Sequence, residues 1–306
     1  MVAIQAQHIS KSFGESTALE SVDLMVEMGE IFGLIGPDGA GKTTLIRILT
    51  SLLIPDSGSA QVMGFDPVSQ KNEIRKIIGY MPGRFSLYQD LSVEENLNLF
   101  ARIFETSIEE NYHLIKDIYS QIEPFKNRKA GALSGGMKQK LALSCAMIHR
   151  PEILFLDEPT TGVDPVSRRE FWDMLGTLNK DGLTILVSTP YMDEAAKCHR
   201  VGLIQSGKIL AVDQSKRISD KFPYSLYSVS GKPMYHLIQA LREFEETISA
   251  YSFGAEIHLS VNDERFDEDQ FREYLIHRDF QKVTIRKIDP GIEDTFISLL
   301  KNKDDV

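Results

Sequence analysis

Residues 36–44 read Gly36-Pro37-Asp38-Gly39-Ala40-Gly41-Lys42-Thr43-Thr44 and directly follow the short apolar run Ile31–Ile35. The glycines allow a tight turn with inward N–H groups, Lys42 adds a positive charge, and the Thr43 hydroxyl suits a magnesium ion. Helical character over residues 43–52 places the positive end of a helix there, which favours an anion. A chance glycine-rich turn is the alternative, but the full match between a strand and a helix indicates a phosphate-binding loop.

Asp38 places a carboxylate close to the expected phosphates. Because like charges repel, this carboxylate would weaken binding unless magnesium or Lys42 compensates for it. We interpret Asp38 as a tolerated variant of the loop. An aspartate that only hydrogen-bonds the backbone of the turn is an equally good interpretation.

A second apolar run, residues 153–156, ends in Asp157 and Glu158. Asp157 would reach the magnesium of the loop through water, and Glu158 would polarise the attacking water for in-line phosphoryl transfer. Acidic residues at a strand end are often only caps or turn formers. The phosphate loop upstream favours the catalytic interpretation, with Lys42 and Glu158 as the catalytic pair.

Ser134, Gly135 and Gly136 precede a segment, residues 137–149, with apolar residues at helical spacing. The exposed N–H groups at such a helix start form an anion site that has no lysine of its own. This suggests contact with a phosphate held elsewhere, such as the nucleotide of another subunit. Taken alone, Ser-Gly-Gly is more often a plain helix start.

The apolar pattern surrounds these motifs with an α/β domain. Residues 2–9 and 19–26 are expected as antiparallel strands joined by a turn at residues 13–14. Residues 85–150 carry helix-like segments with acidic first turns, which predicts a helical subdomain. Residues 183–187 then return as a buried strand, in the pattern of parallel strands with crossovers.

The pattern changes after about residue 220, so we expect two domains, residues 1–220 and 221–306. The length of 306 residues supports this division, because single cores stop growing at about 250 to 300 residues. Within the second domain, residues 226–230 and 256–261 are predicted strands, and residues 234–241 carry one apolar helical face. We therefore predict a small C-terminal α/β domain.

Composition limits the class of protein. A hydrophobic content of 42% and a charged content of 25% are ordinary for a globular chain. The apolar runs fall far short of the roughly 20 residues that cross a bilayer, and Cys145 and Cys198 alone form no disulfide framework. The start of the chain lacks the blocks of a secretory signal, so the cytoplasm is the expected compartment. A formal charge of -10 argues against nucleic acid as a partner.

Taken together, the loop at residues 36–44, Leu133-Ser-Gly-Gly at 133–136, the acidic pair at 157–158 and Gly-Val-Asp at 162–164 closely resemble the ATP-binding cassette (ABC) family. The resemblance spans residues 2–220. It implies an α/β fold of the P-loop NTPase type, with a mixed-sheet core, an antiparallel subdomain and a helical subdomain. It also implies ATP and Mg2+ as cofactors, with Thr43 and Asp157 as metal-binding residues.

The resemblance further implies a head-to-tail dimer, in which each ATP lies between the phosphate loop of one chain and the Ser-Gly-Gly segment of the other. By this resemblance all residues of the loop contact the nucleotide, Phe13 stacks on adenine, and Asp164 makes a contact across the interface. From the residues alone, Phe13 is more often a packing residue than a base platform.

Several short sequence segments resemble ATP-binding subunits of bacterial exporters for drugs, lipids or polysaccharides. These segments are residues 79–82, 87–88 and 91–96, and residues 289–294 match less specifically. Such subunits work with integral membrane permease subunits, since this chain has no span of its own. The resemblance places the protein at the inner face of the cell membrane, as a peripheral subunit.

Two positions depart from the family pattern. Members usually have a glutamine where Gly83 stands and a histidine where Pro190 stands. Glycine offers no side chain, and proline has neither a side-chain donor nor a backbone N–H. His199 lies too far along the chain to be assumed a substitute, and a solvated or capping role is the better interpretation for it. We expect slow hydrolysis at this chain's own loop.

Three hypotheses remain open at this stage. The first is a transport-coupled ATPase subunit, paired with a second and more complete cassette subunit in a heterodimer, with a homodimer as the alternative. The second is a regulatory subunit that binds ATP without hydrolysing it. The third is a cassette protein acting on ribosomes or DNA, which would be expected to carry tandem cassettes or long coiled-coil insertions.

Overall fold

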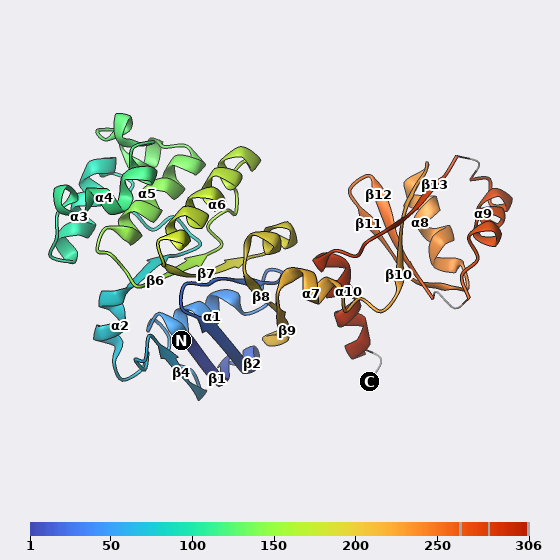
Figure 1. The fold of residues 1–306 in the computed structure, drawn as a ribbon, viewed down its shortest axis with the longest axis horizontal. Helices are drawn as coiled ribbons and strands as arrows, with labels where there is room; N and C mark the ends of the chain where they lie inside the picture. Colours follow the sequence, from blue (N-terminus) through green and yellow to red (C-terminus); the bar gives the residue numbers. More distant parts are fainter. Residues whose placement is uncertain (263–264, 281, 305–306) are drawn as a thin grey trace. The chain divides into compact units, whose positions relative to one another are not determined.

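The computed structural model describes residues 1–262, 265–280 and 282–304. The chain forms two compact units, residues 1–215 and 216–306, and each is described by itself. Figure 1 shows a mixed α/β first unit and a second unit built around one sheet. In the part of the chain that the structure describes, no helix is both long and apolar enough to pass through a bilayer.

The first unit is organised around a six-stranded sheet with the strand order β5-β6-β7-β3-β8-β9. All neighbours in it run parallel except β8 and β9, which are antiparallel. The strands are β3 (Ile31–Ile35), β5 (Ile78–Met81), β6 (Ile153–Asp157), β7 (Thr184–Thr189), β8 (Arg200–Gln205) and β9 (Lys208–Asp213). Because β3, β6 and β7 are parallel neighbours, the segments that follow them open at one edge of the sheet.

A separate antiparallel sheet, β2-β1-β4, covers one side of this unit. Its strands are β1 (Val2–Phe13), β2 (Ser16–Glu27) and β4 (Ser57–Val62). The predicted pair and its turn are confirmed, and both strands run longer than the apolar pattern indicated. Gly14 supplies the positive φ, +59°, that this turn requires.

Helix α1 (Lys42–Leu49) packs between the two sheets, with Leu45, Ile46, Ile48 and Leu49 fully buried. The predicted helix extended to residue 52. It ends earlier because Ser51 adopts a positive φ of 60°, after which the chain turns back onto the helix. The phosphate loop is therefore attached to a short helix held on both faces by apolar contacts.

The expected helical subdomain is present and is grouped together in Figure 1. A serine caps each of its main helices, because the Ser92, Ser107 and Ser134 hydroxyls accept backbone N–H groups of the first turn. The helices of the unit are α2 (Lys71–Ile77), α3 (Val93–Ile103), α4 (Ile108–Tyr119), α5 (Gly135–Met147) and α6 (Pro165–Lys180). Short 3-10 turns are η1 (Glu123–Phe125), η2 (Ala130–Ala132) and η3 (Met192–Lys197).

The second unit is a four-stranded, wholly antiparallel sheet with the order β11-β12-β10-β13. Its strands are β10 (Ser225–Ser230), β11 (Thr247–Phe253), β12 (Glu256–Val261) and β13 (Thr284–Ile288). The helices are α7 (Ser215–Ser219), which begins at the unit boundary, α8 (Met234–Glu243), α9 (Glu268–His277) and α10 (Ile292–Asp304). Leu237 and Leu241 of α8 are buried, as their helical spacing predicts.

Candidate functional site

The loop between β3 and α1 depends on glycine at two positions. A Cβ at Gly36 would lie 2.1 Å from the carbonyl oxygen of Ile204, which no side chain tolerates. Gly41 has a φ of +107°, and a Cβ there would lie 2.5 Å from the carbonyl oxygen of Ala18. The neighbouring backbone thus fixes the path of the loop before any ligand is bound.

Lys42 is almost completely buried and points back into its own loop. Its ammonium group donates to the carbonyl oxygens of Gly36, at 2.8 Å, and Pro37, at 2.9 Å. It also pairs with Glu158 Oε1 at 3.0 Å, with side-chain exposures of 3% for Lys42 and 21% for Glu158. The predicted catalytic residues Lys42 and Glu158 are therefore in direct contact.

Thr43 and Asp157 come together at the adjoining strand end. The Thr43 hydroxyl donates to Asp157 Oδ1 at 3.1 Å, and the Ser188 hydroxyl donates to the same oxygen at 2.7 Å. Carboxylate and hydroxyl oxygens are the ligands Mg2+ prefers, and this ion usually takes one or two protein oxygens plus phosphates and water. No cluster of three His, Cys, Asp or Glu occurs among the described residues. Thr43 and Asp157 therefore fit a Mg2+ site of the kind that has only one or two protein ligands.

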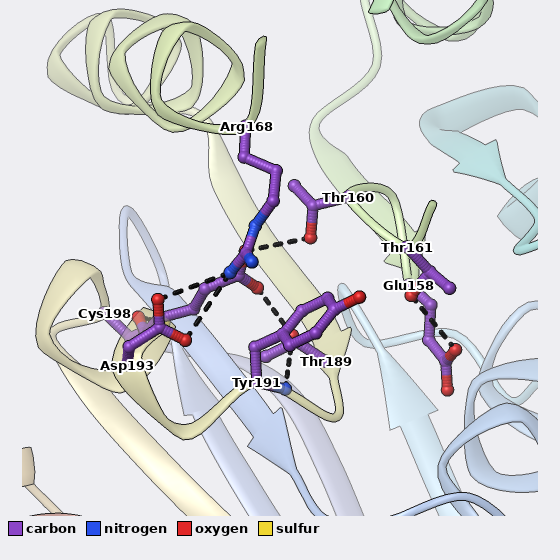
Figure 2. A network of polar contacts seen from close by, with 9 residues as sticks. Glu158, Thr160, Thr161, Arg168, Thr189, Tyr191, Asp193 and Cys198 are labelled. Carbon is purple, nitrogen blue, oxygen red and sulfur yellow. Dashed lines mark hydrogen bonds and ion pairs between the residues drawn. The ribbon is translucent and has the colours of Figure 1, made fainter. Parts of the chain in front are cut away.

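Backbone hydrogen bonds fix the position of Glu158. Its N–H donates to Ser188, reaching the carbonyl oxygen at 3.1 Å and the hydroxyl at 3.0 Å. Its φ is +51°, a rare conformation for a non-glycine residue. Thr161 donates to Glu158 Oε2 at 3.4 Å, as Figure 2 shows. The backbone thus aims the carboxylate toward the loop.

A cavity of about 170 Å3 lies over the loop, lined by Ala18, Asp38, Gly39, Ala40, Gly41, Lys42, Thr43, Thr44 and Glu158. The structure therefore brings the predicted loop residues and Glu158 to one place. A larger cavity of about 1020 Å3 lies beside α4 and α6. It contains none of the phosphate-loop residues, so we assign the chemistry to the smaller one.

The predicted residues Ser134, Gly135, Gly136 and Asp164 do not line the loop cavity. Gly136 packs tightly on α6, since a Cβ there would lie 2.6 Å from the Ser167 hydroxyl oxygen. Asp164 caps α6 by accepting N–H groups from Val166 and Ser167, at 3.1 and 3.0 Å. These hydrogen bonds, with Ser167 foremost, hold the pKa of Asp164 below its usual value. Residues 134–136, which we call the signature segment, thus form a second, separate surface.

Phe13 and Asp38 are both exposed. Phe13 ends β1 with 54% of its surface accessible, so it is not the core packing residue that sequence reasoning alone favoured. The Asp38 carboxylate makes no hydrogen bond to the turn within residues 1–262, 265–280 and 282–304. Both side chains are thus free to meet a nucleotide.

Gly83 and Pro190 both lie close to strand ends at the edge of the sheet that carries the phosphate loop. A Cβ at Gly83 would lie 3.0 Å from the carbonyl oxygen of Asp157. Pro190 follows β7, whose last carbonyl, on Thr189, accepts the N–H of Gly36 at 3.3 Å. His199 is elsewhere, because its Nδ1 accepts the N–H of Ile31 at 2.9 Å, at the opposite end of β3 from the loop.

Sequence reasoning missed a buried carboxylate, Glu194, beside Pro190. With 3% exposure, it accepts hydrogen bonds from Thr160 at 2.9 Å and Thr189 at 2.5 Å, and it pairs with Arg168 at 3.0 Å. Figure 2 shows Arg168 reaching from α6 toward Asp193 and Tyr191, and its guanidinium lies 4.0 Å from the centroid of the Tyr191 ring. The residues around Glu194 carry no helical or strand period, so no signal in the sequence marked it.

Comparison with known proteins gives one consistent result. The ABC transporter family model matches residues 19–161. A Nod factor export ATP-binding protein I of Rhizobium sp. is 32% identical over 303 residues, covering 97% of both chains. A probable multidrug ABC transporter ATP-binding protein of Escherichia coli is 38% identical over 291 residues, which cover 94% of this chain. The chain spans only 50% of the length of that relative.

Among solved structures, a dimeric ATP-binding cassette in a post-hydrolysis state with ADP and phosphate is similar, with a TM-score of 0.62 and 26% identity. The match covers 69% of this chain and 98% of that one. The predicted α/β fold with its mixed sheet, antiparallel subdomain and helical subdomain is therefore confirmed. The chain belongs to the family of ABC transporter ATP-binding proteins.

Proposed function

We propose that this protein is the ATP-binding subunit of an ABC exporter. The carrying observation is that Lys42, Thr43 and Glu158 line one loop cavity. Asp157 adjoins them through its hydrogen bond with the Thr43 hydroxyl. Lys42 would exchange its loop carbonyls and Glu158 for phosphate oxygens, which is a replacement of existing polar contacts rather than a new burial of charge. Thr43 and Asp157 would hold Mg2+, which supplies charge neutralisation at the phosphates.

Hydrolysis at this loop is slow in our proposal. Release of Lys42 frees Glu158 to orient water and accept its proton. Gly83 and Pro190 lie next to strand ends at the edge of the sheet that carries the phosphate loop. Neither residue has a side-chain hydrogen-bond donor for the transferred phosphoryl group. Transition-state charge is therefore stabilised by fewer preorganised groups than in a complete site.

The signature surface, from Ser134 to Gly136, serves a neighbouring cassette. Its N–H groups start α5 and carry the positive end of the helix, yet they lie outside the loop cavity of the same chain. The dimeric cassette described above supports such an assembly. We propose a heterodimer with a complete cassette, with Phe13 stacking on adenine, Asp164 at the interface, and permease subunits that hold the pair at the inner membrane face.

A regulatory subunit that binds ATP and does not hydrolyse it is the second candidate, favoured by Gly83 and Pro190 together. The two candidates share the binding step and differ in phosphate release. Phosphate release from this loop within the assembled complex would decide for the first. ATP binding with no release, even beside the partner, would decide for the second.

Replacing Lys42 with alanine is expected to weaken ATP binding about 10- to 100-fold, because one buried charge-assisted contact to the phosphates is lost. The measurement is a titration with a fluorescent ATP analogue in the presence of Mg2+. Lys208→Ala is the matched control, since Lys208 pairs with Glu20 on the surface. Equal affinity of the two variants would contradict the proposed binding site.

A further inference from the structure

The sheet of the second unit has one face that is apolar and one that is polar. Val229, Ile257 and Leu259 point to the apolar side, where α8 and α9 complete a core. The alternate residues on the same strands, such as Ser228 and His258, belong to the other side because side chains alternate along a strand. An antiparallel sheet normally exposes such a face to water, yet Ser228 is only 2% exposed.

The first turns of α10 cover part of this polar face. Asp294 Oδ1 lies 2.7 Å from His258 Nδ1, with side-chain exposures of 6% and 17%. Asp294 Oδ2 accepts the N–H of Gly291 at 2.8 Å. Burying such groups is costly unless they are hydrogen-bonded, and here His258 and Asp294 are hydrogen-bond partners of each other. The arrangement fixes the histidine ring, which also stacks on Phe253 with centroids 4.0 Å apart.

A cavity of about 160 Å3 remains between the polar face and α10. A cavity of about 150 Å3 is enough for a benzene molecule. The cavity is lined by Phe222, Tyr224, Ile248, Ser249, Tyr251, His258, Ser260, Asp294, Ile297 and Ser298. Aromatic and aliphatic side chains supply half of the lining residues, and the His258–Asp294 pair and three serines supply the other half. Aromatic walls combined with polar groups that can fix a ligand's orientation suit a small molecule that itself carries a polar group.

We propose that this cavity binds a neutral, single-ring aromatic compound carrying one hydroxyl group. Ring size follows from the volume, and neutrality follows because Asp294 already has His258 and a backbone N–H as partners. In the neutral tautomer that donates Nδ1–H to Asp294, the remaining nitrogen of His258, Nε2, would be an acceptor. A hydroxyl donor on the ligand would satisfy it, while the ring packs against the aromatic walls.

The proposal is independent of the ATP site and goes beyond it, since it gives the second unit a ligand of its own. The experiment titrates the full-length protein with phenol and, separately, with toluene, and follows each by ligand-observed NMR. The two molecules have nearly the same shape, but only phenol has a donor. We expect a phenol dissociation constant of about 1 mM or lower and at least tenfold weaker toluene binding.

Ser249→Phe should fill the cavity and abolish phenol binding, because Ser249 lies in its wall. Ser252→Phe is the matched control, since Ser252 is exposed on the same strand and is absent from the cavity. Toluene binding as tightly as phenol would overturn the hydroxyl assignment. Phenol binding that survives Ser249→Phe, or no binding to the unaltered protein at several millimolar, would overturn the site itself.

Discussion

Restoring two side chains, Gly83→Gln together with Pro190→His, is expected to raise the turnover of this chain's own ATP site by about 100-fold or more. One preorganised donor at a developing charge is worth about 10² to 10³ in rate, and both positions lie at the phosphate edge of the sheet. The measurement is single-turnover ATP hydrolysis by the assembled complex with the partner cassette inactivated.

The structure leaves room for these changes. A side chain at Gly83 starts 3.0 Å from the carbonyl oxygen of Asp157, a close contact that the exposed loop around it can relieve by a small shift. The same double variant carrying Glu158→Gln is the control, and it should remain slow because the water-orienting carboxylate is gone. A double variant no faster than the unaltered chain would show that another deficiency limits the site.

The second expected result concerns the signature surface. Ser134→Arg should lower the ATPase activity of the whole complex by about 100-fold or more, whereas Glu158→Gln in this chain should lower it less than about twofold. The reason is that Ser134 opens the helix proposed to close the partner's fast site, while Glu158 serves only the slow one. Steady-state phosphate release by the copurified complex measures both.

Ser107→Arg is a matched control for this experiment. Ser107 caps α4 as Ser134 caps α5, with its hydroxyl accepting the N–H of Glu110 at 3.1 Å, but it lies outside the proposed interface. It reports the cost of losing a helix cap alone, which is about 1 kcal/mol. If Ser107→Arg were as damaging as Ser134→Arg, or if Glu158→Gln stopped the complex, the proposed division between slow and fast sites would be wrong.

The sequence was sufficient to predict the parts of the fold that follow a strong local rule. The loop before α1 requires glycine at positions 36 and 41, because close backbone contacts leave no room for a Cβ there. The β1–β2 pair follows its apolar pattern, and the helical subdomain follows helical segments with acidic first turns. Asp157 was predictable because the carboxyl ends of parallel strands share an edge of the sheet.

The remainder depends on contacts that are distant in sequence. Strands β4, β5, β8, β9 and β11 were not predicted. β4 has only two buried residues and β9 is half-buried after its exposed first residue, so neither shows a clean alternation. Glu194 resembles any surface acid until Thr160, Thr189 and Arg168 surround it. The polar face of the second unit likewise resembles a solvated face until α10 covers it.

The packing of α6 links the phosphate loop with residues 134–136 of the same chain. Ser167 sits directly against Gly136 of the signature, and the next residue, Arg168, holds Glu194 and through it Thr189 at the end of β7. Thr189 in turn accepts the first N–H of the loop, from Gly36. A displacement of α6 would therefore move both surfaces at once, so this helix is a mechanical connection between the phosphate loop and residues 134–136 of the same chain.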